Sequence, residues 1–345
     1  MKPASFAFGW LALLLSGTAF AQLPIWSGSF TDQGTGQNYN FVMVGNDPSN
    51  TGTTNVPVYL IPVVVKFDWT DCQTPYQNTF DPGTKVSNGE TAIQNTIDSP
   101  VFTSINFTQG QSTNSQYLDA FQRSNFWGVV SSNTSYHTVL NPTLMTAQNI
   151  EVPSNDGRAQ LYPPYGGCVD GVNPAWFAGQ ILSLLDTLEQ TQDLSNGLAL
   201  FLVYDVFAGQ APEYTPGGGG YHGWSLTPGL LEFQTYAWAA YNGGTCYQNG
   251  NQVPCPFADV TDVTHEVGEW FDDPRTTNRT GCAGDNALEV GDGSVLDQKY
   301  PYRGQNNFVY HLQDLKFLPY FRASGGTSWG PGWLSFQQES LTPCQ

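Results

Sequence analysis

The segment His265-Glu266-Val267-Gly268-Glu269 contains the residues of this chain that are best suited to chemistry. In a helix, side chains four residues apart lie one turn above each other, so His265 and Glu269 would share a face, with Glu266 beside them. Imidazole and carboxylate both bind zinc, and a catalytic zinc ion commonly has three protein ligands and one position for water. A neighbouring carboxylate can accept the proton of that water. We therefore predict a metal site with ligands His265 and Glu269, and with Glu266 as general base.

This segment resembles the zinc-peptidase pattern His-Glu-x-x-His, in which both histidines bind the metal. Here Glu269 replaces the second histidine, which makes the site harder and more negative, so Zn²⁺ is expected first and Ca²⁺ or Mn²⁺ are alternatives. Glu289 follows Glu269 by 20 residues. Glutamate-type zinc peptidases have their third ligand at a comparable distance along the chain, so Glu289 is the predicted third ligand. Asp292 is the alternative third ligand. His222 is predicted to assist catalysis, either as a further ligand or as a donor to a developing oxyanion.

Two other interpretations of the segment remain open. In one, Glu266 and Glu269 are solvated charges on a surface helix, and His265 is paired within that helix. In the other, a metal ion only braces the fold, because three further aspartates can complete an oxygen-rich calcium site. These aspartates are Asp272, Asp273 and Asp292.

A core must hold the helix that carries this segment. Its apolar residues recur at helical spacing and should face that core: Val260, Val263, Val267, Trp270 and Phe271. The helix should end near Asp272-Asp273-Pro274, because proline disfavours the α conformation in the residue before it.

Other segments predict the framework around the helix. Residues 174–190 form the clearest second helix, with Asn173 as N-cap and Pro174 in the first turn. Residues 198–207 are a continuous apolar run, typical of a strand buried on both faces. Residues 58–69 predict a strand in which Pro62 indicates an edge position or a bulge. Residues 90–97 and 116–126 predict two more helices.

The N-terminus predicts export. Lys2, an apolar run over residues 6–15 and the ending Ala19-Phe20-Ala21 match a secretory signal peptide, residues 1–21, with cleavage before Gln22. No later stretch approaches the roughly 18 apolar residues that a spanning helix needs, so no integral membrane span is expected. We predict a secreted protein, extracellular or periplasmic.

Charge and cysteine content narrow the class further. The net charge of -18 argues against nucleic acid as a partner, since binding it requires Lys and Arg to neutralise phosphates. All six cysteines follow the predicted cleavage point, where an oxidising compartment favours disulfides. Cys246 and Cys255 flank a turn-rich segment and are expected to pair. Residues 22–345 are expected to form one domain, in which 22–170 (β-rich) and 171–345 (the metal-site half) can be subdomains.

The C-terminal half also resembles the plant Exordium, or phosphate-induced protein, family. The matching segments occur in the same order: Tyr221-His222-Gly223, the Cys246 and Cys255 pair, Pro256-Phe257, the His265 to Glu269 helix followed by Asp273-Pro274, and Glu289-Val290-Gly291-Asp292. The resemblance covers about 75 of the 345 residues and departs from the family at Cys282, which here precedes Glu289. It implies secretion and one assembled site made of His222, His265, Glu266, Glu269, Glu289 and Asp292, and no enzymatic activity is carried over from the family.

Together these features predict an α+β, zincin-like, disulfide-bonded fold, in which a mixed sheet and a buried helix support a metal-binding helix. The predicted function is a secreted metal-dependent peptidase that binds Zn²⁺ through His265, Glu269 and Glu289, with a protein or peptide as substrate. The alternative is a non-catalytic secreted protein of the Exordium type, with a structural metal site and cell-wall or envelope partners.

Overall fold

The computed structural model describes most of the chain after residue 21. The described residues are 22–31, 36–70, 78–108, 112–162, 167–209, 218–226, 233–243, 246–248, 251–253, 258–279, 287–292, 300–317 and 335–339. The predicted signal peptide lies outside them, as do the side chains of all six cysteines, so the predicted Cys246–Cys255 pair also lies outside them. No helix in these ranges is long and apolar enough to cross a membrane.

The chain is mostly β, and the predicted zincin-like α+β class is wrong. Among the described residues, strand accounts for 41% and helix for 21%, and the main sheet is curled and mixed. The reason is local: many strands are short or polar, so they lack the apolar periodicity by which a strand is recognised in sequence. β5 (His137–Leu144), for example, includes His137, Asn141 and Pro142 and has few buried positions.

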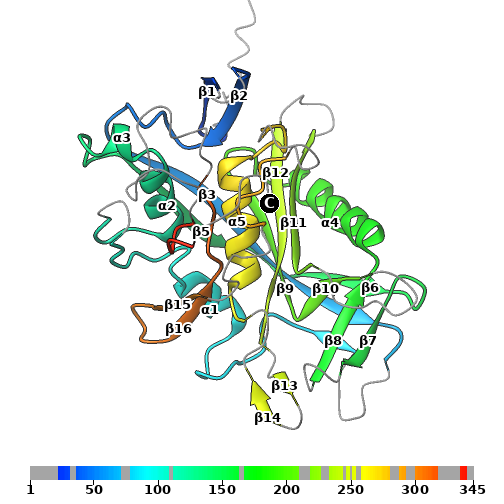
Figure 1. The fold of residues 1–345 in the computed structure, drawn as a ribbon. Helices are drawn as coiled ribbons and strands as arrows, with labels where there is room; N and C mark the ends of the chain where they lie inside the picture. The colour runs from blue at the N-terminus through cyan, green and yellow to red at the C-terminus, as the bar shows by residue number, and fades with distance from the viewer. Residues whose placement is uncertain are drawn as a thin grey trace, which may run out of the picture.

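The main sheet has seven strands (Figure 1). Five follow one another in the order β11 (Gly220–Leu226), β12 (Phe233–Tyr241), β9 (Leu198–Tyr204), β3 (Thr53–Phe67) and β4 (Thr79–Phe80). β12, β9 and β3 are parallel, whereas β11 is antiparallel to β12 and lies at the end of this order. The two remaining strands, β5 and β6 (Gln148–Val152), both pair with β3 in parallel.

β3 is a central strand, so the edge position predicted from Pro62 is wrong. On one side β3 pairs with β9 through Pro62 itself, opposite Leu202. On the other side β5 pairs with β3 as far as Leu60, and β6 pairs from Val63 onward. Pro62 therefore lies where one neighbouring strand leaves and the next one joins. A residue without an N–H is tolerated there, because no ladder bond has to be made on that side.

β9 is buried on both faces, which confirms the prediction from its apolar run. Leu198, Leu200 and Leu202 belong to one hydrophobic core. Ala199, Phe201 and Val203 belong to a second core on the other face. This alternation follows from the period of two in a strand, and it lets both faces of the sheet bury helices.

A helix packs on each face of the sheet. α4 (Pro174–Glu189) buries Phe177, Ile181 and Leu185 in the second core. Its predicted N-cap is confirmed, since the Asn173 side chain accepts hydrogen bonds from two backbone N–H groups. α5 (Thr261–Asp272) packs into the first core, on the opposite side of β11 and β12 from α4 (Figure 1).

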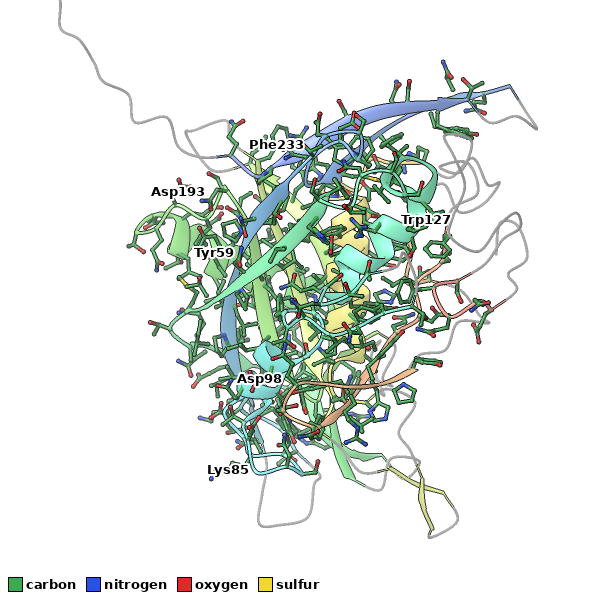
Figure 2. All side chains as sticks on the ribbon, turned by 90° about the vertical axis from the view of Figure 1, so that its left-hand side faces the viewer. Tyr59, Lys85, Asp98, Trp127, Asp193 and Phe233 are labelled. Atoms are coloured by element: carbon green, nitrogen blue, oxygen red, sulfur yellow. The ribbon has the colours of Figure 1, made fainter. Side chains whose placement is uncertain are left out.

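The first core also receives helices α1 (Ala92–Asp98) and α2 (Tyr117–Asn125), close to the predicted ranges, and the short α3 (Trp127–Val130). Side chains from these helices and from β3 crowd the space around α5 (Figure 2). The remaining strands form small sheets: β1 (Ile25–Thr31) with β2 (Asn38–Val44); β7 (Gly157–Tyr162), β8 (Gly167–Val172) and β10 (Val206–Ala208); β13 (Cys246–Gln248) with β14 (Asn251–Val253); and β15 (Tyr300–Arg303) with β16 (Val309–Leu312).

Candidate metal centre

The helix α5 places the His-Glu-x-x-Glu segment against the sheet. Its predicted apolar face is fully buried, with 0% exposure at Val263, Val267 and Trp270. The helix ends at Asp272, as Pro274 predicts. Gly268 brings it close to neighbouring segments: a Cβ there would lie 2.9 Å from Leu315 Cδ1.

The polar face of α5 is buried as well. Glu266 is 4% exposed and Glu269 is 3% exposed, so the interpretation of these residues as solvated surface charges is wrong. Strand β11 covers them and contributes His222, which is 4% exposed. Gly220 allows this close approach, because a Cβ at that position would lie 2.3 Å from Glu266 Cγ. Gly220 is the last residue of the glycine run at positions 217–220, which is the feature of the sequence that could have indicated this contact.

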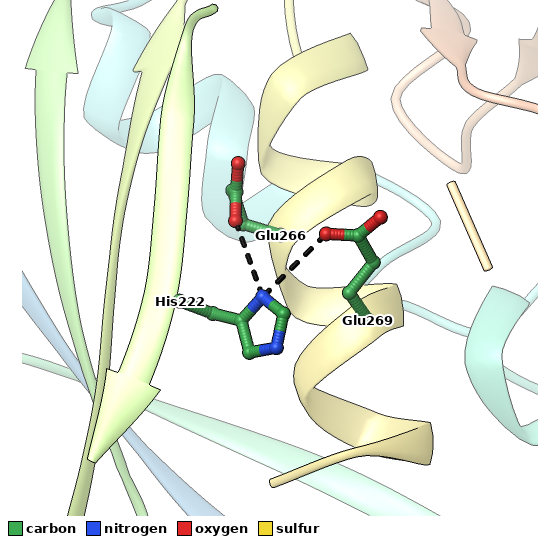
Figure 3. A group of neighbouring side chains, drawn as sticks. All are labelled: His222, Glu266 and Glu269. Carbon is green, nitrogen blue, oxygen red and sulfur yellow. Dashed lines mark ion pairs between the residues drawn. The ribbon is translucent and has the colours of Figure 1, made fainter. Parts of the chain in front are cut away.

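Three ionisable groups meet between β11 and α5 (Figure 3). His222 Nδ1 lies 3.6 Å from Glu266 Oε2 and 3.5 Å from Glu269 Oε2. Two ligands of one tetrahedral zinc ion lie about 3.3 Å apart, given metal–ligand bonds of about 2.0–2.1 Å. This buried His222–Glu266–Glu269 group can hold a metal ion.

A second group shares Glu269 and reaches the surface. His265 Nε2 lies 3.2 Å from Glu269 Oε2 and 3.9 Å from Asp292 Oδ1. The His265 side chain is 22% exposed and that of Asp292 is 61% exposed. His265, Glu269 and Asp292 together form the second set of potential metal ligands.

Glu289 lies beside these groups but belongs to neither of the two found among the described residues. Burial and the charge of Glu269 raise the pKa of Glu289 to about 8. Its Oε2 is buried and has no hydrogen-bond partner. The structure thus brings the predicted residues together, and Asp292, rather than Glu289, completes the group of potential ligands that contains His265 and Glu269.

The charges of the site are strongly interdependent. Burial alone would lower the pKa of His222, but its hydrogen bonds to Glu266 and Glu269 and their charges raise it to about 10. Burial opposes the charge of His265 too, yet Glu269 and its other acidic neighbours hold its pKa well above the usual range. Burial would raise the pKa of Glu269, whereas the two histidines lower it below its usual value. Burial raises the pKa of Glu266. Without a metal ion, protonated histidines therefore balance these carboxylates.

Gln313 orients His265, a role that sequence reasoning missed. Its Oε1 lies 2.7 Å from His265 Nδ1, and its Nε2 donates to the Gly291 carbonyl. A proton on Nδ1 that is shared with Gln313 leaves Nε2 free for a metal ion, which is the usual outer-shell arrangement of a metal-binding histidine. The Gly291 N–H in turn donates to Glu269 Oε1 over 3.3 Å. Nothing in the spacing of the sequence marks Gln313, since it follows His265 by 48 residues.

Gln313→Leu should weaken metal binding by about 10- to 100-fold, because outer-shell partners of metal-binding histidines contribute that much to affinity. The measurement is a competition titration of the metal-free protein against a chromogenic chelator. Gln305→Leu is the control, since Gln305 is exposed, lies outside both ligand groups and donates to the Ser104 carbonyl. Equal affinities for both variants would show that Gln313 does not position His265.

The two aspartates after the segment have separate tasks. Asp273 caps the turn that follows α5 by accepting hydrogen bonds from the N–H groups of Thr277 and Asn278. Asp272 is fully buried, and neither of its carboxylate oxygens has a hydrogen-bond partner. Neither aspartate joins the two ligand groups of the described residues. The calcium site predicted from them therefore has no support in this geometry.

Asp272→Asn should make the protein more stable at alkaline pH. Burial and the charge of Asp273 raise the pKa of Asp272 from 3.8 to about 8. Between these two pH values the folded state keeps a proton that the unfolded chain releases. The contribution of Asp272 to the free energy of unfolding is therefore most favourable below pH 3.8, and it falls as the pH rises toward about 8. Asn has nearly the same shape and no charge at any pH. Its advantage in Tm should grow across this window, and parallel Tm curves for the two proteins would contradict the assignment.

His137 and His311 lie outside the centre and contact other carboxylates. His137 Nδ1 lies 2.7 Å from Asp119 Oδ2. His311 Nδ1 lies 2.6 Å from Asp259 Oδ2. Each histidine is bound by a carboxylate of its own, outside both ligand groups.

Comparison with known proteins adds no identification. No family model matches the chain, and no curated protein or solved structure matches it either.

Proposed function

We propose that this protein is a secreted, zinc-dependent peptidase. The observation that carries the proposal is the contact of 3.2 Å between His265 Nε2 and Glu269 Oε2, beside the carboxylate of Glu266 and at the edge of solvent. Two ligands at tetrahedral spacing, an adjacent base and an accessible side form the minimal set for hydrolysis by an activated water.

Each residue of the centre has a proposed role. His265, Glu269 and Asp292 bind zinc, and Glu289 is close enough to Glu269 to serve as a further ligand. Bound there, zinc would acidify a water molecule and polarise a peptide carbonyl. Glu266, whose Oε1 lies 3.9 Å from His265 Nε2, accepts the proton of the water and passes it to the leaving amine. His222 contacts Glu266 from the other side, with Nδ1 3.6 Å from Glu266 Oε2, and its proposed role is to donate a hydrogen bond to a developing oxyanion.

Metal removal tests this proposal. The purified protein should cleave members of a broad peptide library, lose that activity when dialysed against a chelator, and recover it when Zn²⁺ is added back. Glu151→Gln is the control variant and should behave as the wild type does, because Glu151 is a surface residue on β6 with a side chain 75% exposed. A protein that binds zinc tightly but cleaves nothing from acidic to neutral pH would contradict the peptidase assignment.

The second candidate is a non-catalytic secreted protein of the Exordium type, in which the metal braces the fold and the surface binds cell-wall or envelope partners. The burial of His222, Glu266 and Glu269 favours it, since none is more than 4% exposed. The same chelation experiment separates the two, because a structural ion would change Tm and no turnover would be present to lose.

A further inference from the structure

The donor set of the centre is larger than one zinc ion needs. Two imidazoles and four carboxylates gather there: His222, His265, Glu266, Glu269, Glu289 and Asp292. One divalent cation with three protein ligands would leave half of them unused. Glu266 and Glu269 are buried together, and two carboxylates kept away from water are costly unless cations lie beside them.

One ion cannot bind both histidines in this geometry. Their nitrogens contact the same oxygen, Glu269 Oε2, over 3.5 Å from His222 and 3.2 Å from His265. Two ligand atoms of a single zinc ion are separated by at most about 4.2 Å, twice the bond length. Among the described residues, no group of ligand atoms that all lie within 4.8 Å of one another contains both histidines. The histidines therefore define two positions, one on each side of Glu269.

We propose that the centre binds two divalent cations bridged by Glu269. His222 and Glu266 hold the inner cation, which is buried, and His265 and Asp292 hold the outer cation, which faces solvent. Ions on either side of one carboxylate group fit the separation of about 3.5–4 Å that is typical of two-metal sites. Sets of glutamates and histidines of this size hold metal pairs in other carboxylate proteins.

Glu266 fits a place between the two positions. Its Oε2 faces His222 over 3.6 Å, and its Oε1 faces His265 over 3.9 Å. It can bind the inner cation through Oε2 and keep Oε1 toward the outer one. The two-ion centre rests on the metal site of the proposed function and does not require that the protein be a peptidase.

Metal stoichiometry tests the proposal. Metal-free wild-type protein is loaded with excess Zn²⁺, freed of unbound ion by gel filtration, and analysed by native mass spectrometry with elemental analysis. We expect two ions per chain in wild type and one in each of His222→Ala and Asp292→Asn. Asp292 is exposed, so its variant should fold even if His222→Ala does not. One ion in wild type, or an unchanged count in Asp292→Asn, would overturn the two-ion centre.

Manganese gives a second, independent readout. Loaded with Mn²⁺, wild-type protein should show the electron paramagnetic resonance spectrum of an exchange-coupled pair, and Asp292→Asn should show that of an isolated ion. Isolated-ion spectra from fully loaded wild type would refute the bridge through Glu269. A protein that binds one zinc ion and cleaves peptides would contradict the two-ion centre and support the proposed function. A protein that binds two ions and cleaves nothing would support the two-ion centre and contradict the proposed function.

Discussion

Glu266→Gln should lower kcat for peptide hydrolysis by about 10²- to 10⁴-fold, the usual contribution of a positioned general base. Glutamine has nearly the same shape as glutamate but cannot accept the proton of a water molecule. The outer zinc ion should remain bound, since its ligands His265, Glu269 and Asp292 are intact. KM should change little, because the substitution removes no group that holds the substrate before the reaction.

Two controls make this result specific. Glu151→Gln applies the same chemical change to a surface residue and should leave kcat unaltered. Elemental analysis of Glu266→Gln shows whether outer zinc is still present, and near-ultraviolet circular dichroism shows whether the buried side chain has disturbed the packing. A Glu266→Gln protein that keeps both its zinc and its full kcat would show that another group accepts the proton.

Local signals made the two main helices predictable. Asn173 and Pro174 specify the beginning of α4 through a side-chain cap and a fixed backbone angle. The spacing of Val263, Val267 and Trp270, together with the stop at Pro274, specifies α5. These features act over a few residues, so one sequence is enough to read them. The candidate ligands on α5 followed from the helix, because residues four apart must share its face.

Tertiary pairing was not predictable in the same way. Pro62 indicated an edge strand, yet its tolerance in the centre of the sheet depends on β5 and β6 joining β3 at different heights. That arrangement involves residues about 80 positions further along the chain, and no residue next to Pro62 indicates it. The contact of Gln313 with His265 is equally distant in sequence. The fold class was wrong for the same reason, since short polar strands such as β5 are specified by their partners more than by their own pattern.

Glu269→Ala should abolish metal binding at both positions of the centre. The Oε2 of Glu269 lies 3.5 Å from His222 Nδ1 and 3.2 Å from His265 Nε2, so it contacts both histidines. Loss of this direct ligand should weaken metal binding by at least about 100-fold, because loss of an outer-shell partner alone weakens it by about 10- to 100-fold. Peptide cleavage should fall to background, and isothermal titration of the metal-free variant with Zn²⁺ should show no binding at concentrations that saturate wild type.

Glu289→Ala is the matched comparison, because it removes a neighbouring carboxylate that belongs to neither ligand group of the described residues. It should retain zinc and most of the activity, with a modest loss of affinity. The order of the two effects distinguishes the potential ligand group His265, Glu269 and Asp292 from the one predicted by sequence spacing, in which Glu289 is the third ligand. If Glu289→Ala loses zinc as completely as Glu269→Ala, the carboxylate of Glu289 must turn toward His265 when metal binds, and its unpaired Oε2 would be the atom that moves.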